Sequence, residues 1–268
     1  MKKKPLYPIY LCLILIIIYV PIFVVIIYSF NQSRLTYLWS GLSLRWYREL
    51  FMDRSMFEAL GNSLTLALLT SFFSGAIGTL GAVGMTRRKI RTTEKTIEFL
   101  SILPIMTPEI ILGLSFLAFF TFIALPAGMV TLVIAHTAFC VPYVYLLVKA
   151  RLVGLEKSYF EAARIMGAGD MRAFYDITLP LVLPAVISGM LISFAMSFDD
   201  VIISVFVAGV DTNTLPMKIY SQIKTGVTPK TNAMCTLIFV MTVIICTAAV
   251  MLTHKNKKLR PAPKKQQL

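Results

Sequence analysis

Three carboxylates of this sequence lie inside or at the edge of long apolar segments: Glu109, Asp199 and Asp200. A carboxylate within a membrane span is costly unless it pairs or faces water, so such acids are functional candidates by default. They would serve as counter-charges for a cation that crosses a low-dielectric region. The alternative for each is a structural ion pair or a helix-end cap. We predict that they line a translocation path, with Asp199 the strongest candidate.

Aromatic rings are the second group that could bind a cation, through the faces of their π-systems. Phe139, Tyr143 and Phe198 are the candidates for this role along the path. Packing or lipid contact is the alternative, since the chain holds 2 Trp, 11 Tyr and 18 Phe.

Signatures of enzymes are missing from the sequence: it has no Walker A sequence, no H-E-x-x-H and no G-x-S-x-G. His136 lies mid-span beside Thr137 and is interpreted as an interhelical hydrogen-bonding group rather than a catalytic base. The cysteines show no metal-like spacing and are interpreted as small buried hydrophobes. Neither catalysis nor a metal site is predicted. The cysteines are Cys12, Cys140, Cys235 and Cys246.

The composition indicates that lipid is the solvent for most of the chain. Its 268 residues are 57% hydrophobic and 15% charged, and the mean hydropathy is +0.77. Soluble proteins are about 45–50% apolar and about 25% charged. Six segments reach the length of about 20 residues that a bilayer core requires, so we predict an all-α polytopic membrane domain over residues 1–268. The segments are Ile9 to Tyr28, Leu60 to Met85, Phe99 to Phe122, Ala127 to Val148, Leu181 to Val207 and Ala233 to Thr253.

The basic residues predict the orientation of these six spans. A net charge of +13 would suggest nucleic acid in a soluble domain, but here the basic residues lie between and outside the apolar segments. Nineteen of the 26 fall on the side that holds both termini, which positive charge marks as cytoplasmic. The basic tail from His254 to Arg260 is interpreted as an anchor on anionic lipid. The first span follows a short basic start and is interpreted as a retained helix, not a cleaved signal.

Two local patterns describe how the spans pack and bend. Small residues recur along one face of the second span, where another helix backbone can approach closely. Pro104 and Pro108 are predicted to break the third span. The small residues are Ser71, Gly75, Gly78 and Ala82.

A polar segment between the fourth and fifth spans, residues 149–183, is the most informative loop. Ser158 and Glu161 form a capping box, and Gly167 follows where a short helix would end. A second short helix is predicted from Asp170 to Pro180. Two short helices joined by a glycine turn would form a compact cytoplasmic knob.

The residues of this loop resemble a known family. Glu161-Ala162-Ala163 is followed after three residues by Gly167, and after nine more by Ile177, one residue, and Leu179-Pro180. This spacing matches every fixed position of the EAA-loop signature in permease subunits of bacterial ATP-binding-cassette importers. The order of further elements is similar to the spermidine/putrescine importer permeases, and most similar to the second of their two permease subunits. These elements are Trp46-Tyr47, Pro108-Glu109, residues 197–201 and residues 215–221.

The resemblance implies a type I importer fold in a bacterial inner membrane and a division of labour. This chain would pair with a second permease subunit to enclose a path for polyamines. Two copies of a cytoplasmic ATPase, which use ATP and Mg, would dock on the EAA loop, and an external binding protein would deliver the solute. No cofactor would be bound by this chain. The docking residues would be Glu161, Ala162, Ala163, Gly167, Ile177, Leu179 and Pro180.

Three alternatives stay open at this point. Related permeases for other solutes share the EAA loop, so the substrate could be another small molecule. A secondary carrier would show inverted repeats with paired broken helices, yet no second Pro-Glu pair interrupts a later span. A scaffold without transport explains neither the EAA loop nor the buried acids. For Glu161 itself, helix capping and docking can coexist.

Overall fold

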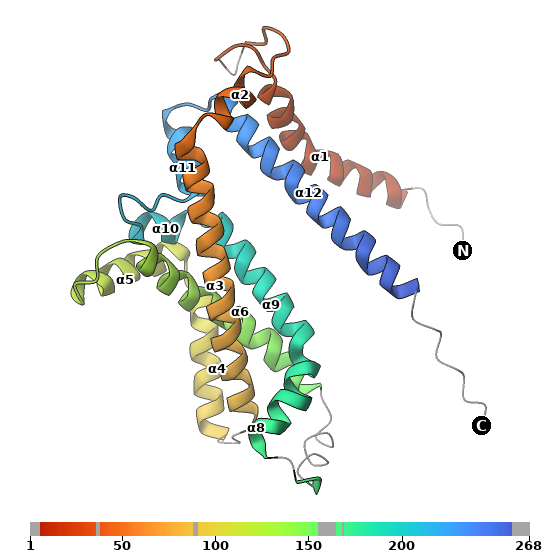
Figure 1. Cartoon of the computed structure of the whole chain (residues 1–268), viewed down its shortest axis with the longest axis vertical. Helices are drawn as coiled ribbons and strands as arrows, with labels where there is room; N and C mark the ends of the chain where they lie inside the picture. Colours follow the sequence, from red (N-terminus) through yellow and green to blue (C-terminus); the bar gives the residue numbers. More distant parts are fainter. Residues whose placement is uncertain (1–5, 36–37, 88–90, 155–164, 168, 259–268) are drawn as a thin grey trace. The chain divides into compact units, whose positions relative to one another are not determined.

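The computed structural model describes residues 6–35, 38–87, 91–154, 165–167 and 169–258. Within these ranges the chain is helical apart from its loops and an isolated bridge between Asn31 and Leu42, so the all-α prediction is confirmed (Figure 1). The helices are α1 (Leu6–Ser29), α2 (Arg45–Phe51), α3 (Arg54–Arg87), α4 (Arg91–Met106), α5 (Glu109–Phe122), α6 (Met129–Val153), α8 (Asp170–Ala173), the π-helix η1 (Phe174–Thr178), α9 (Leu179–Asp199), α10 (Ile202–Val207), α11 (Leu215–Thr225) and α12 (Pro229–Lys258).

The chain divides into two compact units. The first unit combines residues up to Arg54 with those from Gln222 onward, and in it α12 packs against α1 and α2. The second unit runs over Ser55–Ser221 and is built around α6, which packs against α4, α9 and α10.

Among the described residues, four helices are long and apolar enough to cross a membrane, and a bent helix pair raises the number to five. These helices agree with the first, second, fourth and fifth predicted spans, and the bent pair agrees with the third. The apolar stretch described in α12, Pro229–Ile244, is shorter than a full span. The spanning helices are Pro8–Ser29, Arg54–Thr86, Met129–Val153 and Met171–Asp199, and the bent pair is Glu98–Met106 with Glu109–Phe122.

The two predicted helix breaks in the third span have different outcomes. Pro108 separates α4 from α5, and the direction of the helix bends by 108° between them. A proline disfavours helical geometry in the preceding residue, Thr107, which explains where α4 ends. The predicted break at Pro104 is wrong, because Pro104 lies inside α4 close to its last turn.

The fifth predicted span, Leu181 to Val207, is not one continuous helix in the structure. Helix α9 ends at Asp199, Asp200 is extended (φ −65°, ψ 133°), and a separate helix, α10, begins at Ile202. No proline or glycine marks this point in the sequence. The cause is the Asp200 side chain, which caps α10 as described below.

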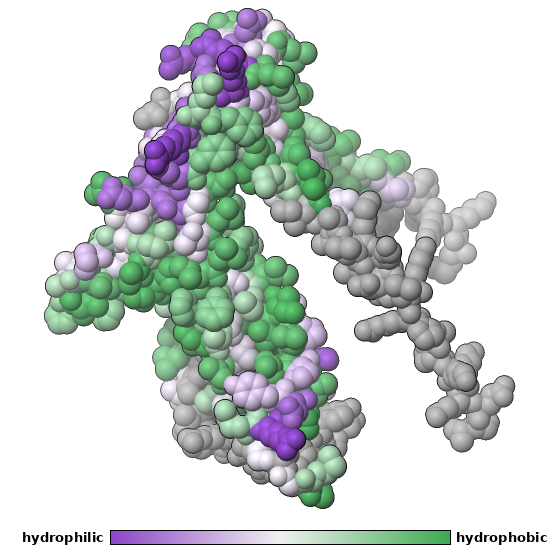
Figure 2. Space-filling view, viewed as in Figure 1, coloured by the Kyte–Doolittle hydropathy of each residue, from purple (hydrophilic) through white to green (hydrophobic). Residues whose placement is uncertain are grey.

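Two clusters of buried side chains form the core of the second unit, and α6 contributes to both. One joins α6 to α3, α5 and α10, and includes Leu66, Phe120, Leu132 and Ile203. The other joins α6 to α3 and α9, and includes Val83, Val144, Val148 and Val182. Outside this core, large apolar side chains such as Leu68, Leu80 and Leu191 are exposed, and much of the coloured surface of this unit on the face shown in Figure 2 is apolar. Such a surface suits contact with lipid.

The stripe of small residues on α3 is a helix-packing seam, as predicted. Ser71 Oγ donates a hydrogen bond of 2.7 Å to the carbonyl oxygen of Met190 on α9. A Cβ atom added to Gly78 would lie 2.8 Å from the Cβ atom of Val144 on α6. The small residues of α3 therefore let this helix lie close to both α6 and α9.

We expect Gly78→Ala to lower the stability of the protein by about 1–3 kcal/mol, the usual cost of overpacking. The added methyl group would also lie 3.0 Å from the backbone nitrogen of Tyr145, which cannot move without shifting α6. The matched control is Gly84→Ala on the same helix, where nothing lies within 4 Å of the added carbon. That change should stabilise by about 0.5–1 kcal/mol through helix propensity. Thermal unfolding in detergent measures both effects. Equal changes in the unfolding temperature of the two variants would contradict the close packing of α3 at Gly78.

Candidate functional site

The predicted acids gather at the two helix breaks of the second unit. Glu109 is the first residue of α5 and is exposed, directly after the bend at Pro108. Asp199 is the last residue of α9 and is also exposed, whereas Asp200 is 8% exposed. Glu109 lies close enough to Asp199 and Asp200 for their charges to interact. Acids that are 90 residues apart in the sequence thus share one electrostatic site.

Close packing of α5 against α10 brings the two breaks together. A Cβ atom added to Gly113 of α5 would lie 2.6 Å from the ring of Phe206 and 3.4 Å from the Cα atom of Ile203. The absence of a side chain at Gly113 allows this approach. Both helices begin at their break, so their N-termini carry partial positive charge that favours nearby carboxylates.

Asp200 has a structural role that the sequence offered only as an alternative. Its carboxylate accepts hydrogen bonds from the backbone nitrogens of Ile203 (3.3 Å) and Ser204 (2.8 Å), and from Ser204 Oγ (2.8 Å). These bonds satisfy the free N–H groups at the start of α10. The geometry supports the helix-cap interpretation for Asp200 and leaves Glu109 and Asp199 as the exposed acids.

His136 is the interhelical hydrogen-bonding group that the sequence predicts. It lies on α6, is 1% exposed, and its Nδ1 atom lies 2.9 Å from Ser197 Oγ. Its Nε2 atom lies 3.2 Å from Ser204 Oγ and 3.4 Å from Asp200 Oδ2. The sequence did not reveal these partners, because they lie more than 60 residues further along the chain.

The three aromatic candidates differ in how much of each ring is available. Phe139 is 4% exposed and belongs to the core, where its ring meets that of Tyr143 edge-on at 5.8 Å. Tyr143 is half-buried and lies within electrostatic reach of Glu109. Phe198 is half-buried and stacks on Phe194 at 5.9 Å. Tyr143 and Phe198 are thus partly accessible, whereas Phe139 is enclosed and acts mainly in packing.

In the part of the chain that the structure describes, no group of three His, Cys, Asp or Glu side chains is placed to hold a common metal ion.

The EAA loop is described only in part. Glu161, Ala162 and Ala163 lie outside the described residues. Gly167 is exposed with φ +81°, the left-handed conformation predicted for a glycine turn. Ile177 and Leu179 are half-buried, and Pro180 is exposed.

The second short helix does not end at Pro180, which corrects the prediction. It starts at Asp170 as expected, but passes through the π-helix η1 into α9. The backbone nitrogen of Leu179 bonds to the carbonyl of Phe174, and Thr178 Oγ1 donates to the carbonyl of Ala173 at 3.2 Å. A proline in a helix removes one hydrogen bond and crowds the preceding turn, and the wider π-turn accommodates both effects.

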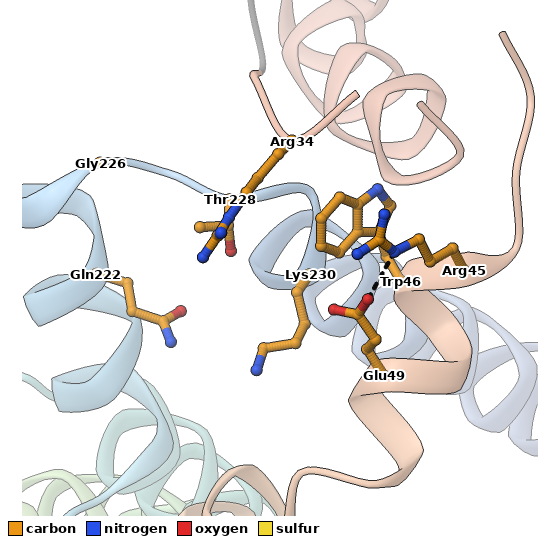
Figure 3. Close-up of a pocket in the computed structure, with 8 residues that line it drawn as sticks. All are labelled: Arg34, Arg45, Trp46, Glu49, Gln222, Gly226, Thr228 and Lys230. Carbon is orange, nitrogen blue, oxygen red and sulfur yellow. Dashed lines mark hydrogen bonds and ion pairs between the residues drawn. The ribbon is translucent and has the colours of Figure 1, made fainter. Parts of the chain in front are cut away.

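The first unit contains a separate polar cavity of about 300 Å³, shown in Figure 3. Lys230 on its wall pairs with Asp53 at 2.6 Å, and Arg45 pairs with Glu49 at 2.7 Å. The indole of Trp46 is buried, and its nitrogen donates to the carbonyl of Asn31 at 2.7 Å. The lining contains three cationic side chains and one carboxylate, so this cavity would repel a polycation such as a polyamine. The lining residues are Arg34, Arg45, Trp46, Glu49, Gln222, Gly226, Thr228 and Lys230.

Residues 74–261 match the family of binding-protein-dependent transport system inner membrane components. The chain belongs to this family of importer permeases. The permease is 37% identical over 239 residues to the spermidine/putrescine transport system permease protein PotC of Haemophilus influenzae, covering 89% of this chain and 93% of the relative. It is 40% identical over 227 residues to the putrescine transport system permease protein PotI of Escherichia coli K12, covering 82% and 81%.

The fold of the permease also agrees with a solved transporter. The crystal structure of a bacterial ABC transporter that imports the acidic polysaccharide alginate contains a chain with a TM-score of 0.73. The two chains are 15% identical, and the match covers 92% of this chain and 94% of the other. At this identity the likeness concerns the fold alone.

Proposed function

We propose that this chain is one permease subunit of an ATP-driven importer for the polyamines spermidine and putrescine. The observation that carries the proposal is the grouping of Glu109, Asp199 and Asp200 at two adjoining helix breaks. The names of the relatives at 37% and 40% identity support the same substrates.

The physical reason for acids at this point is the charge of the substrate. A polyamine carries several ammonium groups at neutral pH, and an unpaired charge in a low-dielectric region is costly. Glu109 and Asp199 are exposed and near one another, so successive ammonium groups can pair with them in turn. Binding must be weak enough for release, and exposed single carboxylates meet this condition better than a closed cage.

The partners follow from what one permease chain lacks. We propose a second permease subunit across the path, two copies of a cytoplasmic ATPase under the EAA loop, and an external binding protein. The family is itself defined as dependent on a binding protein, which supports this last partner. ATP and Mg would be used by the ATPase alone.

Six spans with both termini in the cytoplasm form the proposed topology, in a bacterial inner membrane. Four spanning helices and the bent pair account for five, and α12 would be the sixth. The excess of basic residues in the loops on one side supports the orientation.

Uptake by the complete complex in proteoliposomes tests the proposal. With binding protein outside and ATP inside, we expect accumulation of labelled spermidine and putrescine that stops without ATP or without binding protein. ATP-dependent uptake of another solute in place of polyamines would support the alternative of a different substrate. Uptake driven by an ion gradient in the absence of ATP would indicate a secondary carrier. The break between α9 and α10 makes this test necessary, since a second broken helix is also a feature of carriers.

A further inference from the structure

One imidazole ring joins the two sides of the break between α9 and α10. His136 of α6 contacts Ser197, in the last turn of α9, through Nδ1 at 2.9 Å. Through Nε2 it contacts Ser204 in the first turn of α10 at 3.2 Å, and Asp200 between the helices at 3.4 Å. His136 and Asp200 have side chains that are 1% and 4% exposed, so water does not compete for these contacts.

Such a break within an apolar segment needs polar partners. Backbone groups that leave a helix in a membrane must be satisfied by the protein itself. Asp200 satisfies the start of α10 through the backbone nitrogens of Ile203 and Ser204. His136 in turn holds the cap, because it lies against both Asp200 and Ser204. Removal of the ring would take from Ser197 Oγ the partner it has in the described structure, and from Asp200 and Ser204 one contact each, which is costly for buried groups.

Asp199 is the acid whose backbone position is fixed by the contacts of His136 at the break between α9 and α10. It directly precedes the cap, is exposed, and no other side chain in the described ranges bonds to its carboxylate. The position of its Cα atom, from which the carboxylate extends, therefore depends on the backbone at the break.

We infer that His136 is a positioning residue: by joining α9, Asp200 and α10, it aims the Asp199 carboxylate into the polyamine path. This inference rests on the proposed function for the role of Asp199, but not for the position of residue 199. His136 itself does not touch the substrate, since it is enclosed by the helices that it joins.

The first experiment reads the position of residue 199 without transport. A nitroxide is attached to Asp199→Cys in the assembled complex, with the native cysteines replaced, and its electron paramagnetic resonance spectrum reports local mobility. His136→Ala should increase the mobility of the nitroxide and so narrow its spectral lines. His136→Gln, which keeps a hydrogen-bond donor and an acceptor, should restore the broader lines in part. An unchanged spectrum in folded His136→Ala would overturn the inference.

Matched controls separate the effect of losing the His136 ring, or one of its contacts, from the effect of losing any buried polar side chain. Thr137→Ala removes the neighbouring hydroxyl on α6, which is buried and has no hydrogen-bond partner in the described chain. Should His136→Ala fail to assemble, Ser197→Ala removes one contact of the ring, and Ser193→Ala is its control one turn away. Ser197→Ala should increase mobility at position 199 and Ser193→Ala should not. Equal effects of the two serine variants would also overturn the inference.

The second experiment is a double-mutant cycle on polyamine uptake per ATP hydrolysed. We expect His136→Ala to lower this ratio about tenfold, which corresponds to about 1.4 kcal/mol. Combined with Asp199→Asn, it should cause no further loss, because the residue that it positions has already lost its charge. Two losses that multiply would mean that His136 acts independently of Asp199, and would overturn the inference while the proposed function stands. Normal uptake in Asp199→Asn alone would instead contradict the path role, whatever the spectra show.

Discussion

Asp199→Asn is expected to lower polyamine uptake about a hundredfold at equal amounts of assembled complex, because an ammonium group without its counter-charge in a span costs about 2.5–3 kcal/mol. Glu109→Gln should act in the same direction. Both side chains are exposed, and neither caps a helix through a hydrogen bond in the described structure, so assembly should be retained. Initial rates of labelled spermidine uptake in proteoliposomes measure the effect. The stimulation of ATP hydrolysis by polyamine-loaded binding protein should fall less than the rate of polyamine uptake.

The control for charge itself is Asp211→Asn, the same substitution at an exposed acid between α10 and α11. It should leave uptake within about twofold of the parental rate, as is usual for surface changes. Parental rates in both path variants would show that Glu109 and Asp199 are structural, and the polyamine proposal would then lose its physical support. A loss that is equal in all three variants would point to overall charge and not to a path.

The sequence was sufficient to find the acids, because a charge in an apolar segment contradicts the pattern around it. It also located the break at Pro108, since the proline ring acts on its own neighbours. The break at Asp200 could not be predicted in this way. There Asp200 bonds to Ser204, four residues ahead, and meets His136, which lies far back in the sequence. An aspartate in an apolar segment suggests a cap only as one alternative, and the distant histidine leaves no local signal.

The same distinction explains the helix around Pro180. A proline in the sequence suggests a helix end, but the structure continues through a π-turn that Thr178 and Leu179 stabilise with hydrogen bonds. The cavity in the first unit could not be predicted either, since residues 34–49 and 222–230 form it together. Composition and spacing reveal which residues are unusual, whereas tertiary contacts decide which of them meet.

The glycine at the centre of the EAA loop offers the sharpest test of coupling to the ATPase. We expect Gly167→Trp to reduce capture of the ATPase by at least about tenfold, equivalent to about 1.4 kcal/mol, and to reduce uptake together with it. Nothing in the described chain lies within 4 Å of an added Cβ at Gly167, so the described residues do not oppose the start of a larger side chain there. Glu161→Lys, at the first position of the signature, should act in the same direction by reversing a charge at the interface.

Two further variants separate the bulk of the side chain from backbone strain. Gly167→Ala keeps the site small but places a side chain at φ +81°, which costs about 1–2 kcal/mol locally. Gly169→Trp places the same bulk two residues away, where space is open and no left-handed conformation is required. If Gly167 contacts the ATPase, Gly167→Trp should weaken capture of the ATPase more than Gly167→Ala or Gly169→Trp does. Equal capture by Gly167→Trp and Gly169→Trp would remove Gly167 from the interface.

Performed on membrane vesicles, the same binding assay also tests the proposed orientation. Purified ATPase should bind to inside-out vesicles that contain the permease and not to right-side-out vesicles, because the EAA loop and both termini face the cytoplasm in the six-span topology. Binding only to right-side-out vesicles would contradict the charge-based orientation. We expect Gly167→Trp to lose binding of the ATPase to inside-out vesicles and Gly169→Trp to keep it. This result would support both the cytoplasmic position of the EAA loop and the need for a small residue at its turn, where the ATPase binds.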